Sequence, residues 1–355
     1  MKFVALSEAL RNLADLARFI ESSDQKSAAI KVILDAGPNV GNSAYDWALG
    51  ASEFTPGRTY DYVCAVILLY GILERFIEDV AEEYVQFIVS KTPSYGRLPE
   101  KMRSTHFDLT VLHLQRTSDS RYDGLASASE LTTCLAACLA GEVPYRFISE
   151  SITHHTANFR TPVIDDFFGR LGISSISRRC VSTQSFVVHL KAVDISASTE
   201  RPEAALDLVN DLVLRRNQVA HGDINNAIRP SDLLPYCEQV SVYCVSIAEL
   251  LHESFVGHVA QGSGVDHGKP VSVFNNNIVC IQTKGAVLMI GTRLAIQRTD
   301  ESWYCAEVLG IQIDHADIGQ TPAGKFPIIK TTGFDVSGLY VSVILSGYRK
   351  TSWTT

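Results

Sequence analysis

The sequence has no CxxC pair, no excess of basic residues and no apolar run long enough to cross a bilayer. Its eight cysteines are scattered, and the N-terminal MKFVALSEAL lacks the apolar run of a signal peptide, so we expect a reducing, cytoplasmic environment. The apolar stretch YVCAVILLYGIL (62–73) is too short for a transmembrane helix and is typical of a core helix. We therefore expect no membrane association.

Acidic residues outnumber basic ones, and the formal net charge is −8. This balance argues against a protein that coats nucleic acid or anionic membranes through bulk electrostatics. A polyanionic ligand would therefore need a local basic site. The chain has 355 residues, of which 46% are hydrophobic, and this is enough for two domains with a core in each.

Cys134 and Cys138 are one helical turn apart and match half of a metal site. No second pair of ligands with suitable spacing lies near them in the sequence. Free cysteine commonly packs as a small hydrophobic residue, so we expect both to be structural. The sequence predicts no metal site and no cofactor.

The helical period dominates from residue 3 to about residue 256. A long helix is expected within 61–93, closed by Pro93, because its apolar positions cover a wide arc, as in a central helix. Other helices are expected at the N terminus and in later segments: 127–139, 145–171 with an interruption before Pro162, 202–221 and 232–259. The polar segment 91–125 contains several prolines and glycines, so we interpret it as a long loop or insertion.

After QGSGVDHGKP (261–270) the period changes from helical to alternating, which indicates short strands. The sequence thus predicts an α+β, multidomain fold. An all-α helical bundle is expected over 1–258, a linker over 259–270 and a small antiparallel β-barrel over 271–355. The barrel is similar to SH3-like or Tudor-like modules in pattern only.

The stretch LRRNQVAHGD (214–223) places polar residues at the end of an amphipathic helix. Arg216 and Asn217 project beside its apolar stripe, whereas Arg215 points roughly 150° away and is interpreted as a surface charge. A guanidinium beside an apolar face costs several kcal/mol unless it is paired or lines a cleft or interface. Gly222 lets the helix stop, so His221 is expected at an accessible end. On geometry alone a second interpretation stays open, in which Arg216 and His221 cap the helix.

The segment RNQVAHG resembles the signature of the HEPN superfamily of nucleotide-binding helical domains, in which arginine precedes histidine by a short spacing. LLYGILERFIEDV (68–80) is similar to the long second helix of that superfamily. NFRTPVIDDFFGRLGI (158–173) is similar to a segment of its bacterial RiboL-PSP-HEPN branch. The resemblance covers roughly residues 1–256 and leaves the C-terminal tail unassigned.

The resemblance implies a metal-independent endoribonuclease that works as a homodimer with a composite active site. Arg216 would hold the scissile phosphate, Asn217 would have an orienting role, and His221 would act as general acid or base. Histidine titrates near neutrality and the planar guanidinium matches phosphate geometry, so the chemistry agrees with these roles. The products would be 2′,3′-cyclic phosphate and 5′-hydroxyl ends.

Three further residues receive supporting roles from the resemblance. Glu74 can lie near the motif, although Glu74, Glu78 and Glu82 also match a solvated helix face. Asn158 and Arg160 are candidate RNA-binding residues, although they also fit an ordinary helix surface.

The expected setting is a bacterial toxin or phage-defence system, with RNA as the substrate and an antitoxin or defence protein as a possible partner. One alternative is a catalytically inactive HEPN scaffold that binds RNA or a defence protein. Another is a partner of a nucleotidyltransferase that is modified on a tyrosine, but Tyr70 and Tyr84 do not form the motif for it.

Overall fold

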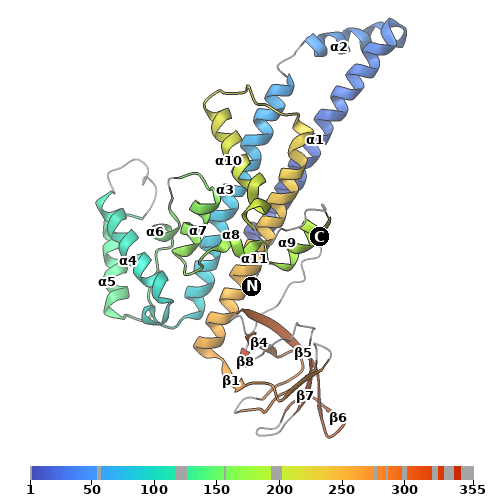
Figure 1. Ribbon diagram of the computed structural model, residues 1–355. Helices are drawn as coiled ribbons and strands as arrows, with labels where there is room; N and C mark the ends of the chain where they lie inside the picture. Colours follow the sequence, from blue (N-terminus) through green and yellow to red (C-terminus); the bar gives the residue numbers. More distant parts are fainter. Residues whose placement is uncertain are drawn as a thin grey trace.

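Long helices form the frame of the molecule. The computed structural model describes residues 2–53, 57–116, 126–155, 157–192, 202–274, 278–284, 287–297, 302–321, 327–331 and 340–344. Within these, α1 (Val4–Ala36), α3 (Gly57–Lys91) and α11 (Leu234–Ser263) pack against one another (Figure 1). The wide apolar arc predicted for α3 is confirmed by a set of buried side chains: Val66, Leu69, Tyr70, Leu73, Phe76, Ile77, Val80 and Tyr84. α3 is therefore the central helix.

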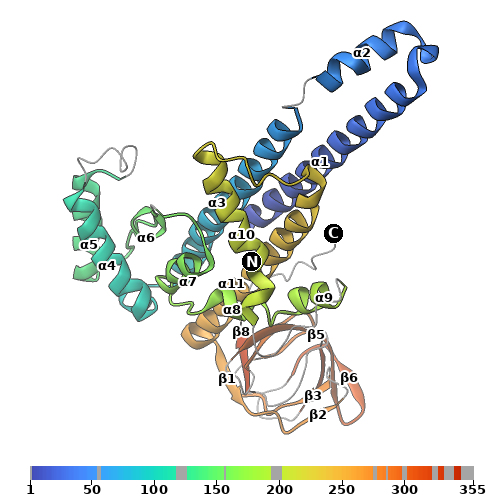
Figure 2. The same cartoon turned by 45° about the horizontal axis from the view of Figure 1, so that its top comes forward.

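The far half of α1 leaves the helical body. Its buried residues end at Ile20, although the helix continues to Ala36. A short 3-10 turn, η1 (Gly37–Val40), and α2 (Asn42–Glu53) then lead back toward α3. Figures 1 and 2 both show this part projecting from the body as an arm.

The interpretation of 91–125 as a long loop is wrong for most of the segment. After η2 (Tyr95–Arg97), residues Glu100–Gln115 form α4, which packs against α5 (Ala128–Ala140). The buried face of α4 is mostly polar: Met102, Thr105, His106, Thr110 and His113. Such a face carries little hydrophobic periodicity, so the sequence pattern gives no sign of the helix. Residues 117–125 lie outside the described residues.

The single interrupted helix expected over 145–171 is two helices, and the described residues between them form no regular structure. The short α6 (Glu150–Thr153) ends before His154, and α7 (Thr161–Gly169) begins with Pro162 in its first turn. Proline fits there because the first helical N–H groups have no partner inside the helix. The remaining helices follow in order: α8 (Ile176–Cys180), α9 (Gln184–Ala192), η4 (Pro202–Leu206), α10 (Asp207–Ala220) and η5 (Pro230–Leu233).

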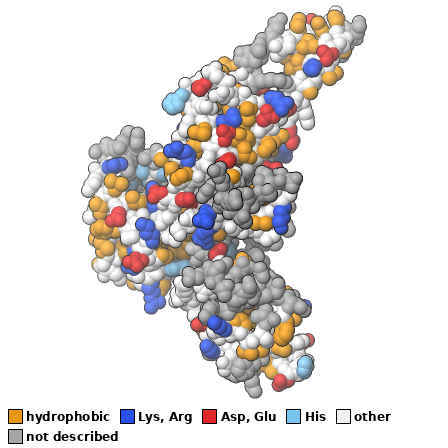
Figure 3. Space-filling model, in the orientation of Figure 1, with side chains coloured by type: hydrophobic (Ala, Val, Ile, Leu, Met, Phe, Trp, Pro, Cys, Tyr) orange, Lys and Arg blue, Asp and Glu red, His pale blue; other side chains and the backbone are white. Residues whose placement is uncertain are grey.

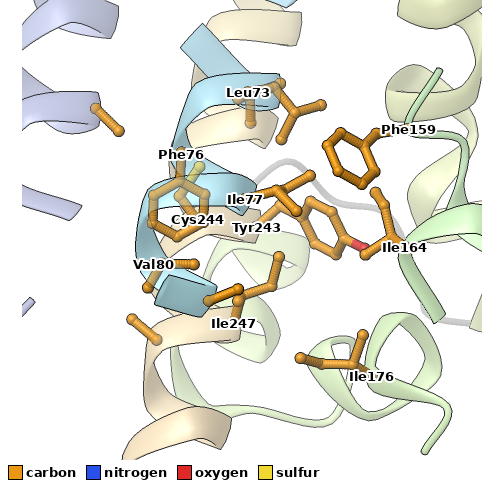
Figure 4. Packing of buried hydrophobic residues seen from close by; sticks show 14 of the residues in the cluster. Leu73, Phe76, Ile77, Val80, Phe159, Ile164, Ile176, Tyr243, Cys244 and Ile247 are labelled. Carbon is orange, nitrogen blue, oxygen red and sulfur yellow. The ribbon is translucent and has the colours of Figure 1, made fainter. Parts of the chain in front are cut away.

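The main core lies where α3 and α11 meet the shorter helices. Figure 4 shows Leu73 and Ile77 of α3 close to Tyr243 of α11, with Phe159 and Ile164 beside them. Phe159 precedes α7 and is fully buried, so the segment between α6 and α7 is anchored in this core. That anchor fixes the neighbouring residues of the segment against α3.

The C-terminal region is a curled antiparallel sheet (Figure 2). Its described strands are β1 (Val265–Gly268), β2 (Ser272–Phe274), β3 (Ile278–Cys280), β4 (Arg293–Gln297), β5 (Trp303–Ile313), β6 (Ala316–Ile318), β7 (Ile328–Thr331) and β8 (Tyr340–Ile344). The order is β1-β8-β4-β5-β7-β3-β2, and β6 pairs with β5. β4 pairs with β5 in antiparallel register.

The expected closed barrel is not formed. In the strand order of the described residues, β1 and β2 are the two ends and do not pair. These end strands have only four and three residues, so they offer few ladder hydrogen bonds for closure. The chain is therefore α+β as predicted, but its C-terminal sheet is a half-barrel.

The sheet is attached directly to α11. The helix extends to Ser263 and β1 begins at Val265, so part of the segment expected to be a linker is helix and strand. A Cβ atom added to Gly257 of α11 would lie 2.6 Å from Cδ1 of Trp303 in β5, which leaves room only for glycine. The division into the domains 1–258 and 271–355 stays a prediction.

Among the residues that the structure describes, one helix is long and apolar enough to qualify as a membrane span. It covers Pro230–Gly262, and 61% of its most apolar window is buried inside the protein. The core helix of a soluble protein passes the same test, and this helix forms part of the main core.

Candidate active site

The end of α10 presents His221 at the surface. Gly222 has a φ of 75°, and its N–H donates to the carbonyl of Val219 while that of Asp223 donates to Gln218. These two bonds form a Schellman motif, which confirms that the helix stops at Gly222. His221 is the C-cap residue and is exposed. Its imidazole is therefore accessible to a ligand.

Arg216 is held by an amide and an aromatic ring. Its Nη1 donates to Oδ1 of Asn217 at 3.3 Å, and its guanidinium carbon lies 5.0 Å from the ring centre of Tyr70. A cation over a tyrosine face is attracted by the ring quadrupole. In the part of the chain that the structure describes, no carboxylate forms an ion pair with Arg216. The half-buried guanidinium thus keeps its positive charge available for an anion.

The same amide joins α10 to the segment between α6 and α7. Oδ1 of Asn217 also accepts from Nδ2 of Asn158 at 2.8 Å. Two turns earlier on α10, Oδ1 of Asn210 accepts from the N–H and the hydroxyl of Thr161, both at 3.1 Å. The segment is therefore fixed along one side of α10, and Asn158 acts through Asn217.

Glu74 contacts the motif through Tyr70. The Tyr70 hydroxyl donates to Oε1 of Glu74 at 2.9 Å and accepts from the N–H of Phe159 at 3.1 Å. Burial, and after it the nearby carboxylate of Glu74, raise the pKa of Tyr70, so the phenol stays protonated and remains a donor. Tyr70 is committed to these internal bonds. Glu74 thus orients the ring beneath Arg216.

The placement of Arg215 in solvent is wrong. Its side chain is only 17% exposed and forms an ion pair of 2.6 Å with Asp211. It also donates to the hydroxyls of Tyr236 and Tyr62, each at 3.3 Å. The apolar stripe of α10 indicates one buried side, whereas the helix is contacted by both α3 and α11. Arg215 is a structural residue whose charge is neutralised.

Arg160 and His221 stand apart from this network. Arg160 is the exposed N-cap residue of α7, and no side-chain hydrogen bond or ion pair of it is found within the described ranges. His221 follows Arg216 by five positions, which is about 7.5 Å along the axis and about 140° around it. One chain therefore brings together Arg216, Asn217, Asn158, Tyr70 and Glu74, but not His221.

A charged pair beside the network was not predicted from the sequence. His155 Nε2 lies 2.7 Å from Oε1 of Glu78, and its Nδ1 lies 3.0 Å from the carbonyl oxygen of Ala157. Burial lowers the pKa of His155, but the hydrogen bonds to Glu78 and Ala157 outweigh it, so the pKa is raised overall. The sequence does contain one sign of this arrangement. Tyr70, Glu74 and Glu78 are spaced four residues apart on α3, which places them on one helix face.

The cysteines pack as expected. Cys134 and Cys138 are buried and unbridged. Among the residues whose placement is described, no group of three or more histidine, cysteine, aspartate or glutamate side chains could hold a metal ion.

The visible charges do not gather into one surface of a single sign. In Figure 3, basic and acidic side chains alternate over the helical body. Any polyanion that binds to this face would meet interspersed charges of both signs, not a broad basic patch.

Comparison with protein families gives one match. The model of the RiboL-PSP-HEPN family matches residues 50–253, which include α3, the segment before α7, α10 and most of α11. No curated protein and no solved structure matches the chain. HEPN domains are generally ribonucleases or RNA-binding modules, and they often dimerise. The match spans more than half of the chain and contains the whole network around Arg216, and we conclude that the protein belongs to the RiboL-PSP-HEPN family.

Proposed function

We propose that the protein is a metal-independent endoribonuclease that cleaves RNA to 2′,3′-cyclic phosphate and 5′-hydroxyl ends. One observation carries the proposal, namely the contrast between two consecutive arginines on α10. Arg215 is paired with Asp211, whereas Arg216 is half-buried, held by Asn217 and Tyr70, and without a carboxylate partner among the described residues. A half-buried and uncompensated guanidinium is costly unless an anion binds to it. A phosphodiester supplies that anion.

The proposed reaction assigns roles to Arg216, Asn217 and His221. The 2′-hydroxyl of the substrate attacks phosphorus, its proton leaves to a base, and the bond from phosphorus to the 5′-oxygen breaks as that oxygen gains a proton. His221 supplies one of these proton transfers, because an imidazole can give or accept a proton near neutral pH. Arg216 stabilises the negative charge that grows on the phosphoryl oxygens, and Asn217 orients the guanidinium.

Two copies of the chain complete the proposed site. Within one chain, Arg216 and His221 are on different sides of α10 and share no contact in the described structure. A homodimer can place His221 of one copy near Arg216 of the other, and the family often dimerises. We further propose that the enzyme works as a toxin or phage-defence effector, with an antitoxin or defence protein as partner.

The test uses a purified chain and a defined RNA of mixed sequence in excess EDTA. Wild type should cleave this RNA, and a fully 2′-O-methylated copy should stay intact, because the attacking group is missing. His221→Ala and Arg216→Gln should each reduce cleavage by about a hundredfold or more. Arg178→Gln, which changes an exposed arginine outside the network, should cleave as wild type does. Mass spectrometry of the fragments should show cyclic phosphate ends.

The alternative is an inactive HEPN scaffold, and it is favoured by the distance between Arg216 and His221 within one chain. In that case every RNA stays intact, yet RNA binding still weakens in Arg216→Gln. Cleavage that persists unchanged in His221→Ala would refute the catalytic assignment.

A further inference from the structure

The segment between α6 and α7 has a second attachment to α3, outside the motif. His155 at its start bonds to Glu78, whereas Asn158 and Phe159 at its centre bond to Asn217 and Tyr70. These contacts connect parts of the chain that are 59 to 89 residues apart in sequence. The pair His155–Glu78 and the site around Arg216 therefore share one short piece of backbone.

The geometry of the His155 ring requires a particular protonation state. One ring nitrogen faces a carboxylate oxygen of Glu78 at 2.7 Å, and the other faces the carbonyl oxygen of Ala157 at 3.0 Å. A carbonyl oxygen and an ionised carboxylate accept hydrogen bonds but cannot donate them. Both bonds exist together only when both ring nitrogens carry a proton, that is, when His155 is an imidazolium. A neutral ring loses one of the two.

The ring also packs on the segment that it anchors. Its centre lies 4.0 Å from that of Phe159, whose N–H donates to the hydroxyl of Tyr70. The ring of Tyr70 lies beneath the guanidinium of Arg216. A change at His155 is thus transmitted through one aromatic contact and one hydrogen bond to the ring that supports Arg216.

Charged groups on several elements act on His155. Glu78 and Glu74 of α3 favour its charged form, and Glu78 bonds to it directly. The neighbouring His154 is coupled to it, to His113 of α4 and to Arg170, which follows α7 and donates to the carbonyl of His154. The carboxylates favour the charged form of His155, whereas His113 and Arg170 act on His154, whose pKa is lowered mainly by burial.

We infer that His155 is a proton-dependent positioning residue, whose imidazolium clamps residues 157–160 to α3 and thereby holds Asn158 on Asn217 beside Arg216. The clamp closes when His155 is protonated and loosens as the pH rises through its titration. Its effect on RNA cleavage rests on the proposed function, but the clamp itself is measured without substrate. His155 is 10% exposed and both its nitrogens are engaged, so it acts through Asn158 and not on the substrate.

The clamp is tested by NMR on the full-length protein. The dipeptide Asn–Phe occurs once in the sequence, at 158–159. Labelling asparagine with carbonyl 13C and phenylalanine with 15N therefore yields one HNCO signal, the amide of Phe159. A second sample carries 13C-labelled histidine, and the His155→Gln variant identifies the His155 signal. Both signals are followed against pH.

We expect the amide of Phe159 to titrate with the same midpoint as the His155 ring, at a pH above the ordinary value of about 6.5. Glu78→Gln keeps an acceptor but removes the charge, so it should move both midpoints to lower pH. In His155→Gln the amide of Phe159 should not titrate. His315→Gln, which changes an exposed histidine between β5 and β6, should leave the titration unchanged.

Cleavage of the mixed RNA, measured across the same pH range, tests the positioning role separately. The ratio of wild-type to His155→Gln activity should be about ten at low pH. It should approach one at high pH, where the clamp is open in both proteins. A ratio that is constant with pH would overturn the positioning role. An amide of Phe159 that ignores pH, or a His155 midpoint that Glu78→Gln does not lower, would overturn the clamp. If no RNA is cleaved, the NMR result still decides whether the clamp exists.

Discussion

Asn158 and Asn217 are joined by a hydrogen bond of 2.8 Å between the Nδ2 of the first and the Oδ1 of the second. They are 59 residues apart in sequence, one on the segment before α7 and the other on α10. Because Oδ1 of Asn217 also accepts from Arg216, one amide oxygen connects the backbone segment to the guanidinium. The position of Arg216 therefore depends on a residue far outside the RNQVAHG motif.

This bond predicts energetic coupling between the two asparagines. In a double-mutant cycle with Asn158→Ala and Asn217→Ala, urea unfolding should give a coupling energy of about 1 kcal/mol, as for a typical protein hydrogen bond. The control cycle combines Asn158→Ala with Asn210→Ala, because Asn210 bonds to Thr161 instead. The control pair should be additive, and equal coupling in both cycles would contradict the assignment.

The two arginines of α10 should differ in what their loss affects. Arg215→Gln removes an ion pair and hydrogen bonds to α3 and α11, so it should lower the free energy of unfolding by about 2 kcal/mol. Arg216→Gln should change that free energy by less than about 1 kcal/mol but should weaken RNA binding. Urea unfolding and an RNA-binding titration at fixed salt measure both quantities. A larger stability loss for Arg216→Gln than for Arg215→Gln would mean that its charge is structural.

A composite site in a homodimer predicts complementation between inactive variants. As homodimers, Arg216→Ala and His221→Ala should each reduce cleavage by about a hundredfold or more. A heterodimer of the two, made by co-expression with different affinity tags, has one site with an intact arginine from one copy and an intact histidine from the other. Its cleavage rate should recover to about half of the wild-type rate, one of two sites being intact.

If each chain built its own site, both sites of that heterodimer would lack one residue and cleavage would stay absent. A heterodimer of wild type with the double variant Arg216→Ala/His221→Ala is the matched control. In the composite arrangement each of its sites lacks one residue, so it should be inactive. Activity in the control and none in the complementing pair would place each site within one chain.

The contact between Gly257 and Trp303 predicts a steric effect at the junction of helix and sheet. Gly257→Ala places a methyl group 2.6 Å from the indole, so it should destabilise the protein by about 1–3 kcal/mol through overpacking. Gly262→Ala lies in the same helix with nothing within 4 Å of its added Cβ. It should be neutral or slightly stabilising, because alanine favours helix over glycine. Thermal unfolding of the two variants decides this, and equal melting temperatures would argue against tight packing there.

The sequence predicts best the features that depend on local spacing of apolar residues and on local signals that end a helix. The arc on α3 and the stop at Gly222 follow from helical periodicity and from the left-handed conformation that glycine adopts. The resemblance of RNQVAHG to the HEPN signature also predicts the family, and the match over residues 50–253 confirms it. The sequence does not predict α4, because the buried face of this helix carries threonine and histidine and so shows little hydrophobic periodicity.

The remainder of the site depends on contacts that no local pattern contains. Arg215 is neutralised by Asp211 one turn earlier on α10, but its burial depends on Tyr62 and Tyr236, on two helices that approach α10 from different sides. The pairing of His155 with Glu78 spans 77 residues. Only the packed arrangement of α3, α10 and the segment before α7 reveals these partners.

α11 contacts both α10 and the sheet, because it runs without a break from one to the other. Near one end of α11, the Tyr236 hydroxyl accepts a hydrogen bond from Arg215 on α10. Near the other end, Gly257 lies against Trp303 of β5. About 30 Å of uninterrupted helix separates the two contacts. Because α11 is continuous between these contacts, the half-barrel and α10 are packed against the same rigid helix.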